Sequence, residues 1–139
     1  MTTSLYQDIR GALQNRLAAV TGIPAIAYEG KGYTPVAGTP FVEPVFIPIS
    51  SPPVTNGDQK VFLHEGLFQV AVVYPVAKGT GPAEAMADAI KASFTPGTVL
   101  SNGAAVVRFR FAQRGRALID PHWVRVPVSI AWYMHSQTN

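Results

Sequence analysis

The hydrophobic pattern of one stretch predicts a buried strand followed directly by a helix. Residues 67–74 form a nearly unbroken apolar run rich in β-branched side chains, which is typical of a strand covered on at least one face. Pro75 ends this run because proline has no N–H to donate to a neighbouring strand. After the glycine-rich loop 79–81, residues 82–94 place apolar side chains at helical spacing, and Gly97 closes the helix. A strand that leads into an amphipathic helix indicates a helix packed on a sheet, and therefore an α+β fold.

Another helix is predicted at the start of the chain. Its apolar positions recur every three or four residues and so lie on one face: Leu5, Ile9, Leu13, Leu17 and Val20. Ser4 and Gln7 have the spacing of a capping box, which marks the first turn of a helix. Gly22 is expected to supply the left-handed cap at the other end, and Pro24 prevents the helix from continuing.

Between the two helices the pattern predicts strands and loops. Residues 25–29 are a short strand candidate, and residues 30–40 are rich in glycine, proline and threonine, as loops are. Residues 41–49 are extended and apolar. Because Pro44 and Pro48 remove two hydrogen-bond donors from this segment, we expect it at a sheet edge or with a bulge.

The strongest loop signal lies in residues 50–59, which combine Pro-Pro with Asn-Gly. Residues 60–65 lead from this loop back to the buried strand. The pattern therefore predicts a long hairpin with its tip at residues 52–57. Such an arm would be unusual in a monomer, whereas in a ring or tube it would be a natural contact.

The C-terminal third predicts the antiparallel part of the sheet. Asn102-Gly103 is a hairpin signal. Residues 104–111 alternate after it, and residues 122–134 alternate over their whole length. In the first of these strands the expected apolar face consists of Ala105, Val107, Phe109 and Phe111, and the opposite face carries Arg108 and Arg110.

The elements together predict one α+β domain covering residues 1–139. We expect a mixed, largely antiparallel sheet of about 4–6 strands with two helices packed on it, plus a proline-rich hairpin or loop arm. Charged residues make up only 14% of the chain, against a norm of roughly 25%. A sparsely charged surface is easier to explain if part of it contacts other subunits.

Composition also restricts the chemistry and the location. The chain has no cysteine, which excludes disulfides and thiol nucleophiles. No apolar run approaches the roughly 18 residues that cross a bilayer, and the first ten residues lack the apolar region of a signal peptide. We therefore expect no membrane contact and a protein made in the cytoplasm or kept in something assembled there.

The net charge is +3, but the arginines are unevenly spread. Five of the seven lie in one C-terminal stretch: Arg108, Arg110, Arg114, Arg116 and Arg125. A local basic patch can contact the phosphate backbone of a nucleic acid. A solvated strand face followed by a basic turn explains the same residues and is the more common case.

No motif for catalysis, cofactor binding or metal binding is found. The loop 79–81 precedes a helix but lacks the lysine of a phosphate-binding loop, so a strand-to-helix connection is the simpler interpretation. The three histidines have no metal-ligand spacing. His64-Glu65 and Asp120-Pro121-His122 are more simply solvated pairs at strand ends or turns than acid–base pairs. Trp132 is expected in the core, and Trp123 is either an interface anchor or a partly buried residue.

The order of the segments resembles that of a known family. After the first helix come Ala27-Tyr28-Glu29, Gly38-Thr39-Pro40-Phe41 and Gly66-Leu67-Phe68-Gln69-Val70, and then a helix ending in Phe94-Thr95-Pro96-Gly97 and a last strand with Trp123 and Pro127-Val128-Ser129-Ile130. In this order the chain resembles the tail terminator-like proteins of long-tailed bacteriophages, the group that includes the lambda minor tail protein U. The resemblance covers nearly the whole chain, and its specificity comes from the order of the motifs.

That resemblance implies a structural protein without catalytic residues, cofactor or metal. Tail terminators form hexameric rings that cap the tail tube and present a surface for joining the head. The implied partners are further copies of the chain, the tail tube protein and the head–tail connector protein, with non-specific contact to passing DNA allowed. Candidate contacts between subunits or with the tube are Pro52, Pro53, Val54, Asn56 and Trp123, and candidates for the lumen or for salt bridges are Arg108, Arg110, Arg114 and Arg116.

Three alternatives remain. A small basic DNA-binding domain would use the same arginines, yet the first helix carries only Arg10 and Arg16 as basic residues. Another neck or tail-completion protein would share the architecture. An enzyme with an unrecognised site would show a concave pocket with perturbed titrating groups.

Overall fold

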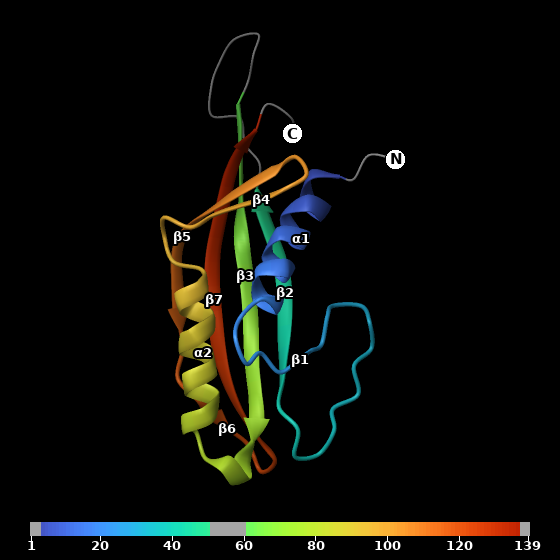
Figure 1. Ribbon diagram of the computed structural model, residues 1–139, viewed down its shortest axis with the longest axis vertical. Helices are drawn as coiled ribbons and strands as arrows, with labels where there is room; N and C mark the ends of the chain where they lie inside the picture. Colours follow the sequence, from blue (N-terminus) through green and yellow to red (C-terminus); the bar gives the residue numbers. More distant parts are fainter. Residues whose placement is uncertain (1–3, 51–60, 137–139) are drawn as a thin grey trace.

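Two helices cover one face of a seven-stranded sheet in the computed structural model, which describes residues 4–50 and 61–136 (Figure 1). The α+β prediction is confirmed, with one strand more than the upper end of the expected range of about 4–6. The helices and strands, with a short 3-10 helix η1, are α1 (Leu5–Ala18), β1 (Ala25–Ile26), β2 (Phe41–Ser50), β3 (Phe62–Pro75), η1 (Val76–Lys78), α2 (Gly81–Ser93), β4 (Val99–Asn102), β5 (Ala105–Arg114), β6 (Leu118–Ile119) and β7 (Trp123–Ser136).

The sheet is mixed and largely antiparallel, as predicted. Its order is β1-β2-β3-β7-β5-β4, with β6 paired to β7 beside β5. Only the short β1 runs parallel to its neighbour among the described strand pairs. The long hairpin predicted around residues 52–57 is confirmed in its two strands, because β2 pairs antiparallel with β3. Its expected tip, with candidates Pro52, Pro53, Val54 and Asn56, lies outside the described residues.

Helix α1 has the predicted start and an earlier end. The hydroxyl of Ser4 accepts a hydrogen bond from the backbone N–H of Gln7, as in an N-cap. The apolar stripe faces the sheet, and Ile9 is fully buried within it. The helix ends at Ala18, so Gly22, with φ of 77°, forms the following turn and not the cap itself. Likewise Gly97 lies in the turn after α2, which Phe94 caps.

Asp8 ties α1 to the hairpin of β4 and β5. Its carboxylate Oδ2 accepts the backbone N–H of Ala104 at 3.1 Å, and its backbone carbonyl accepts the Asn102 side-chain amide at 2.9 Å. The turn at Gly103 has φ of 56°, a conformation that glycine adopts without strain. The Asn-Gly hairpin signal is therefore confirmed, and the hairpin is docked on the helix.

We expect Asp8→Ala to lower the free energy of unfolding by about 1–3 kcal/mol, because it removes the hydrogen bond that the buried carboxylate of Asp8 accepts from the N–H of Ala104. Urea unfolding followed by circular dichroism measures the change. Asp88→Ala is the matched control, since Asp88 is an exposed carboxylate that pairs with an arginine at the surface and contributes little. Equal stability losses in the two variants would contradict the proposed role of Asp8.

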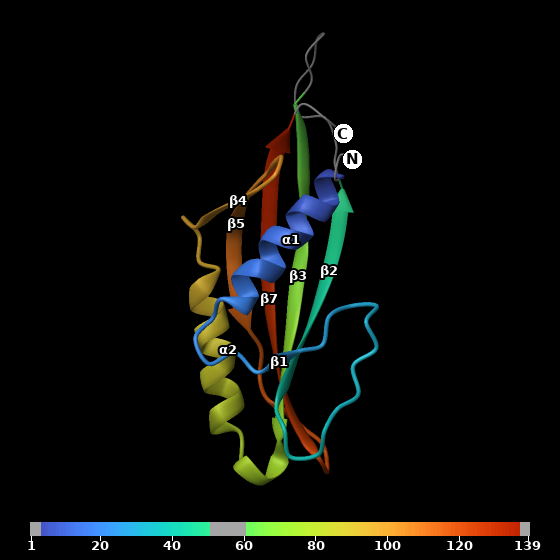
Figure 2. The ribbon, with the colours of Figure 1, turned by 45° about the vertical axis from the view of Figure 1, so that its right-hand side comes forward.

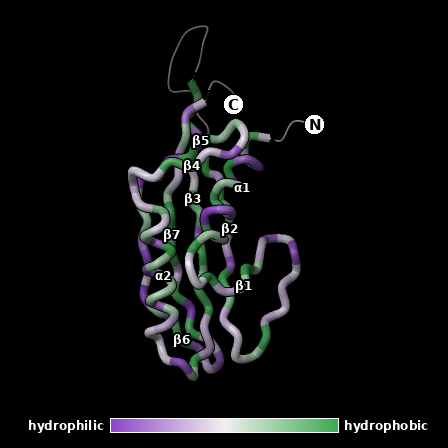
Figure 3. Tube along the Cα trace, viewed as in Figure 1, coloured by the Kyte–Doolittle hydropathy of each residue, from purple (hydrophilic) through white to green (hydrophobic). Residues whose placement is uncertain are grey.

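Alternation along the strands divides the sheet into a buried face and an open face. Figure 2 shows both helices on the same side of the sheet, and Figure 3 shows hydrophobic residues running along the strands. Helix α2 lies close to the sheet through small side chains at Ala83 and Ala87. The core beneath the helices includes Phe68, Ile130 and Trp132, all with no exposed surface. Trp132 is thus a core residue, as predicted.

A bulge in β5 makes one sequence expectation wrong. The pairing of β5 with β7 shifts between Phe109 and Phe111, so an extra residue enters the strand there. Because side chains alternate, this insertion turns Phe111 to the face opposite Phe109, where it is 40% exposed. Beyond the bulge Arg114 turns toward α2, although the sequence predicted it in a basic turn with Arg116.

Candidate assembly surface

The face of the sheet opposite the helices carries polar and charged side chains among apolar ones. Within residues 4–50 and 61–136, no helix lies on this face (Figures 1 and 2). We call it the open face, and its side chains come from alternate positions of four strands: Glu43, Val45, Glu65, Gln69, Arg108, Arg110, Phe111, Arg125, Pro127, Ser129, Tyr133 and His135.

Two ion pairs cross the open face. Arg125 on β7 reaches over β3 to Glu43 on β2, with 2.7 Å between Nη1 and Oε1. Its cross-strand partner on β3 is Val73, which has no exposed surface. At the other end, the Arg110 guanidinium lies 4.4 Å from the ring centroid of Tyr133 and 3.7 Å from Glu65. Both pairs are partly exposed, so each contributes little to stability, but they hold long side chains flat on the sheet.

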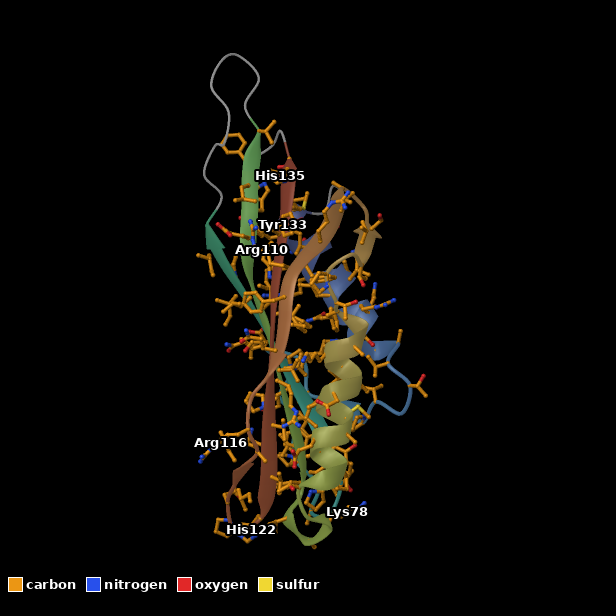
Figure 4. All side chains as sticks on the ribbon, turned by 90° about the vertical axis from the view of Figure 1, so that its left-hand side faces the viewer. Lys78, Arg110, Arg116, His122, Tyr133 and His135 are labelled. Carbon is orange, nitrogen blue, oxygen red and sulfur yellow. The ribbon has the colours of Figure 1, made fainter. Side chains whose placement is uncertain are left out.

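The arginine-rich stretch does not form one patch in space. Arg114 faces α2 and pairs with Asp88 at 2.9 Å and Glu84 at 3.2 Å, and the hydrogen bond to Asp88 raises the pKa of Arg114 further above its ordinary value. Arg108 and Arg116 are exposed and form no ion pair with any described residue. Figure 4 shows Arg110 and Arg116 at different heights of the sheet.

The outer edge of β2 has almost no hydrogen-bond donors. The N–H of Phe46 points away from β3 and donates to Glu29 Oε1 at 2.7 Å. Peptide groups alternate along a strand, so the nitrogens of Pro44 and Pro48 face the same way, and neither carries a hydrogen. Between these two prolines the described edge therefore offers no free N–H. Strand β1 pairs only with Phe41 and Val42, so the rest of β2 lies at the edge as predicted, and its pairing with β3 has a bulge between Pro48 and Ser50.

A cavity of about 240 Å³ lies at this edge, where the loop after β1 meets the open face. Its walls combine Glu29 and Tyr33 from the loop with Glu43 and Val45 from β2 and Arg125 from β7. The cavity was not predicted from the sequence. Its residues are far apart along the chain, and no local motif around Glu29 or Glu43 marks either as part of a site.

Trp123 lies near the cavity, at the start of β7. Its ring packs edge-on against Phe41 with 5.5 Å between centroids, and it is partly buried. With Pro35 and His122 it lines a second hollow of about 370 Å³. Trp123 and Trp132 lie on opposite faces of β7, and Trp123 stays a candidate contact residue.

His64 is not part of a solvated pair, contrary to the expectation. It is fully buried, with Nδ1 3.1 Å from the Tyr6 hydroxyl and Nε2 2.7 Å from the Ser136 hydroxyl, so it joins α1 to the end of β7. Glu65 points to the other face of the sheet, toward Arg110. The described residues contain no cluster of three or more histidine, aspartate or glutamate side chains able to hold a metal ion.

Asp120 organises the turn between β6 and β7. Its carboxylate Oδ1 accepts the backbone N–H groups of His122 at 2.8 Å and Trp123 at 2.6 Å, and these bonds lower the pKa of Asp120. The pair Asp120 and His122 is thus a turn contact through the backbone and not an acid–base pair of side chains.

We expect the Asp120 carboxyl to titrate below the ordinary aspartate value of about 3.9. A depressed folded-state pKa stabilises the turn above the unfolded pKa, and this contribution disappears as the pH falls through the folded value. Carboxyl chemical shifts recorded by NMR between neutral and acidic pH give the midpoint. A midpoint at or above the ordinary value would contradict the hydrogen-bonded turn, whereas Asp120→Ala is expected to loosen His122 and Trp123 at every pH.

Comparison with known proteins identifies the family. A family model described as phage tail terminator protein matches residues 8–132. The chain belongs to the phage tail terminator family, whose members are structural tail proteins and not enzymes. A comparison with curated protein sequences finds no significant match.

Solved structures share the fold. One chain is 27% identical with a TM-score of 0.74, and the match covers 95% of this chain and 96% of that one. A second match is a chain in the virion of a native gene transfer agent (GTA) particle, 18% identical with a TM-score of 0.64, covering 97% of this chain and all of that one. No helix among the described residues is long and apolar enough to span a membrane.

Proposed function

We propose that this protein terminates the tail of a phage or prophage particle by forming a ring that caps the tail tube and presents the head-joining surface. Membership of the tail terminator family, over residues 8–132, is the observation that carries the proposal. The shared fold with a chain of the gene transfer agent virion supports it. The ring is proposed to be a homo-hexamer, made in the bacterial host cytoplasm and located on the virion tail.

The proposed partners follow from this position. One side of the ring contacts the tail tube protein, the other contacts the head–tail connector protein, and DNA passes through the lumen. Pro52, Pro53, Val54, Asn56 and Trp123 are candidates for contact with the tube or a neighbouring subunit. Arg108 and Arg110 are candidates for the lumen, because both lie on the open face.

The rival function, a small basic DNA-binding domain, is less well supported by the geometry. Such a domain needs several cations on one surface that follows the phosphate backbone. Here Arg114 is engaged by two carboxylates of α2, Arg125 by Glu43, and Arg110 by Glu65. Arginines that lie close together in the sequence therefore form ion pairs with different parts of the fold.

The test is negative-stain microscopy of the purified protein, alone and mixed with polymerised tail tubes of its own phage. Rings, or density at the tube ends, support tail termination. A protein that ignores tubes but shifts DNA with an affinity that falls steeply with salt would replace this proposal by DNA binding. Deletion of residues 52–57 then tests the arm, and charge reversal at Arg108 and Arg110 tests the lumen.

A further inference from the structure

We propose that neighbouring subunits contact each other through opposite edges of their sheets, with Arg116 of one copy entering the cavity beside Glu29 and Glu43 of the next. The inference rests on the proposed ring, and it names the surfaces that build it. One edge supplies Arg116, which forms no ion pair with the residues that the structure describes, and the other edge supplies a cavity with carboxylates. Two unlike surfaces on one subunit give a head-to-tail contact, which closes into a ring when the rotation between copies permits.

The two surfaces lie at the same height on the sheet. Across the strands Glu43 pairs with Ala71, Ala71 pairs with Pro127, and the carbonyl of Pro127 accepts the N–H of Gly115 at 2.8 Å. Arg116 directly follows Gly115, so it stands at the end of the row that begins at Glu43. A neighbour placed alongside, without a shift along the strands, therefore brings its Arg116 to this cavity.

The direction of Arg116 agrees with this placement. It follows β5, on the far side of β7 from β2, and its side chain is exposed. Figure 4 shows Arg116 pointing outward on the side of the sheet away from α2. The cavity also opens on the open face, since Glu43, Val45 and Arg125 all point there.

The cavity suits a guanidinium. The cavity is lined by two carboxylates, Glu29 and Glu43, and by one guanidinium, that of Arg125, so the charge of its lining is negative. Glu29 uses Oε1 for the N–H of Phe46, which leaves its second oxygen as an acceptor. Tyr33, whose ring packs on the buried ring of Phe41 with 5.1 Å between centroids, adds aromatic surface on which a planar guanidinium can stack.

Other cations near the cavity are already engaged. Arg10 and Lys31 line the adjoining hollow on the α1 side of Glu29. The Arg10 guanidinium lies 5.2 Å from the Phe46 ring centroid, and the Lys31 ammonium lies 5.8 Å from that of Tyr28. They face the helix side of the edge, so the open face remains the approach for an arginine from another copy.

A row of apolar residues next to the charged row strengthens the match. On the Arg116 edge, Leu118 is 49% and Ile119 64% exposed, although both lie in a paired strand. Across the sheet, Leu118 pairs with Arg125, Arg125 pairs with Val73, and Val73 pairs with Phe41. This row of paired residues therefore ends beside the loop that contains Val36, which is 57% exposed. Head-to-tail packing buries apolar surface on both copies together with the charged pair.

The contact is made by side chains and not by strand pairing. The β2 edge has no free N–H between Pro44 and Pro48, so a neighbouring strand could not form a regular ladder there. The loop after β1 stands outside this edge (Figure 2), so a neighbour meets the loop and the cavity that it lines first. The sheets of adjacent subunits therefore stay separate.

Cysteine cross-linking tests the contact, because the natural chain has no cysteine to interfere. Arg116→Cys is combined with Val45→Cys, which lies in the cavity wall, and a flexible bismaleimide spans the length that the arginine side chain would fill. We expect the double variant to give a ladder of covalent oligomers that ends at the ring size. Each single variant is expected to remain mostly uncross-linked, since a head-to-tail contact does not bring identical residues together.

Arg108→Cys combined with Val45→Cys is the matched control, because it places the cysteine at a different position along the strands. Arg108 pairs with Tyr133 and through it with Glu65, several residues along the sheet from the Glu43 row. We expect this pair to cross-link poorly. Equal or better cross-linking from position 108, or dimers from Arg116→Cys alone, would overturn the proposed register.

Charge reversal supplies a second readout. We expect Arg116→Glu to lower the fraction of protein in rings by about tenfold, as for loss of a charged anchor at an interface. Lys91→Glu makes the same charge change at an exposed position of α2, away from both proposed surfaces, and is expected to leave assembly intact. Folding of both variants is checked by their thermal transitions.

The outcomes separate the two proposals. Rings or capped tubes, together with the ladder of covalent oligomers from Arg116→Cys with Val45→Cys, support both tail termination and the proposed contact. Rings or capped tubes without that ladder leave tail termination standing and reject this contact. A chain that stays monomeric alone and with tubes, and gives no ladder, contradicts both.

Discussion

Replacing Gly66 with alanine is expected to lower the free energy of unfolding by about 3 kcal/mol, as for overpacking against atoms that cannot move. A β-carbon at Gly66 would collide with the carbonyl oxygen of Ile47, and it would lie 2.7 Å from a ring carbon of Trp132 and 3.0 Å from the α-carbon of Pro48. Two of these three atoms belong to the backbone of β2, so relief requires the paired strands to separate. Urea unfolding measures the loss.

The matched control is Gly81→Ala at the first residue of α2. A β-carbon there meets no atom within 4 Å, and the backbone is not left-handed. We expect this variant to be neutral or slightly more stable, because alanine favours a helix and restricts the unfolded chain. If Gly66→Ala were as stable as Gly81→Ala, the close approach of β2 to β3 at Gly66 would be wrong.

Local signals were enough to predict most of the fold. The start of α1, the strand leading to α2 and the Asn-Gly hairpin each depend on a few neighbouring residues, and all three are confirmed. Ends of elements were less certain, as Ala18 shows for α1, because glycine and proline mark where a helix cannot continue and not where it stops. The strand expected at residues 25–29 shortens to Ala25–Ile26 because the chain then leaves the edge, and Glu29 bonds to Phe46 through its side chain.

The candidate assembly surface was harder to predict because its residues meet only across the sheet. The sequence placed Arg108, Arg110, Arg114 and Arg116 together, and alternation alone would keep the first three on one face. One inserted residue at the bulge reverses that alternation and sends Arg114 to Glu84 and Asp88. Nothing in the sequence marks a bulge within an alternating strand. Rows such as Glu43, Ala71 and Pro127 likewise depend on strand register, which long-range packing decides.

Trp132→Ala is expected to be the most destabilising single change in the core, at about 3–5 kcal/mol. Trp132 has no exposed surface, stacks on Phe46 with 5.3 Å between centroids, and lies over Gly66, its partner across β3 and β7. Its indole Nε1 has no hydrogen-bond partner among the described residues, so Trp132→Phe gives up only packing and is expected to cost clearly less. Urea unfolding ranks the two variants, and equal losses would mean that ring packing is not what Trp132 supplies.

Gly66 and Trp132 should also be coupled, since the indole occupies the space that a side chain at Gly66 would need. In the double variant Gly66→Ala with Trp132→Phe, the smaller ring relieves one of the three collisions and leaves the two with β2. We therefore expect the combined loss to fall below the sum of the single losses by roughly 0.5–1 kcal/mol. Strictly additive losses would show that the backbone collision with β2 accounts for the whole effect of Gly66→Ala. Coupling would show that the absence of a side chain at Gly66 makes room for Trp132, the largest side chain of the core.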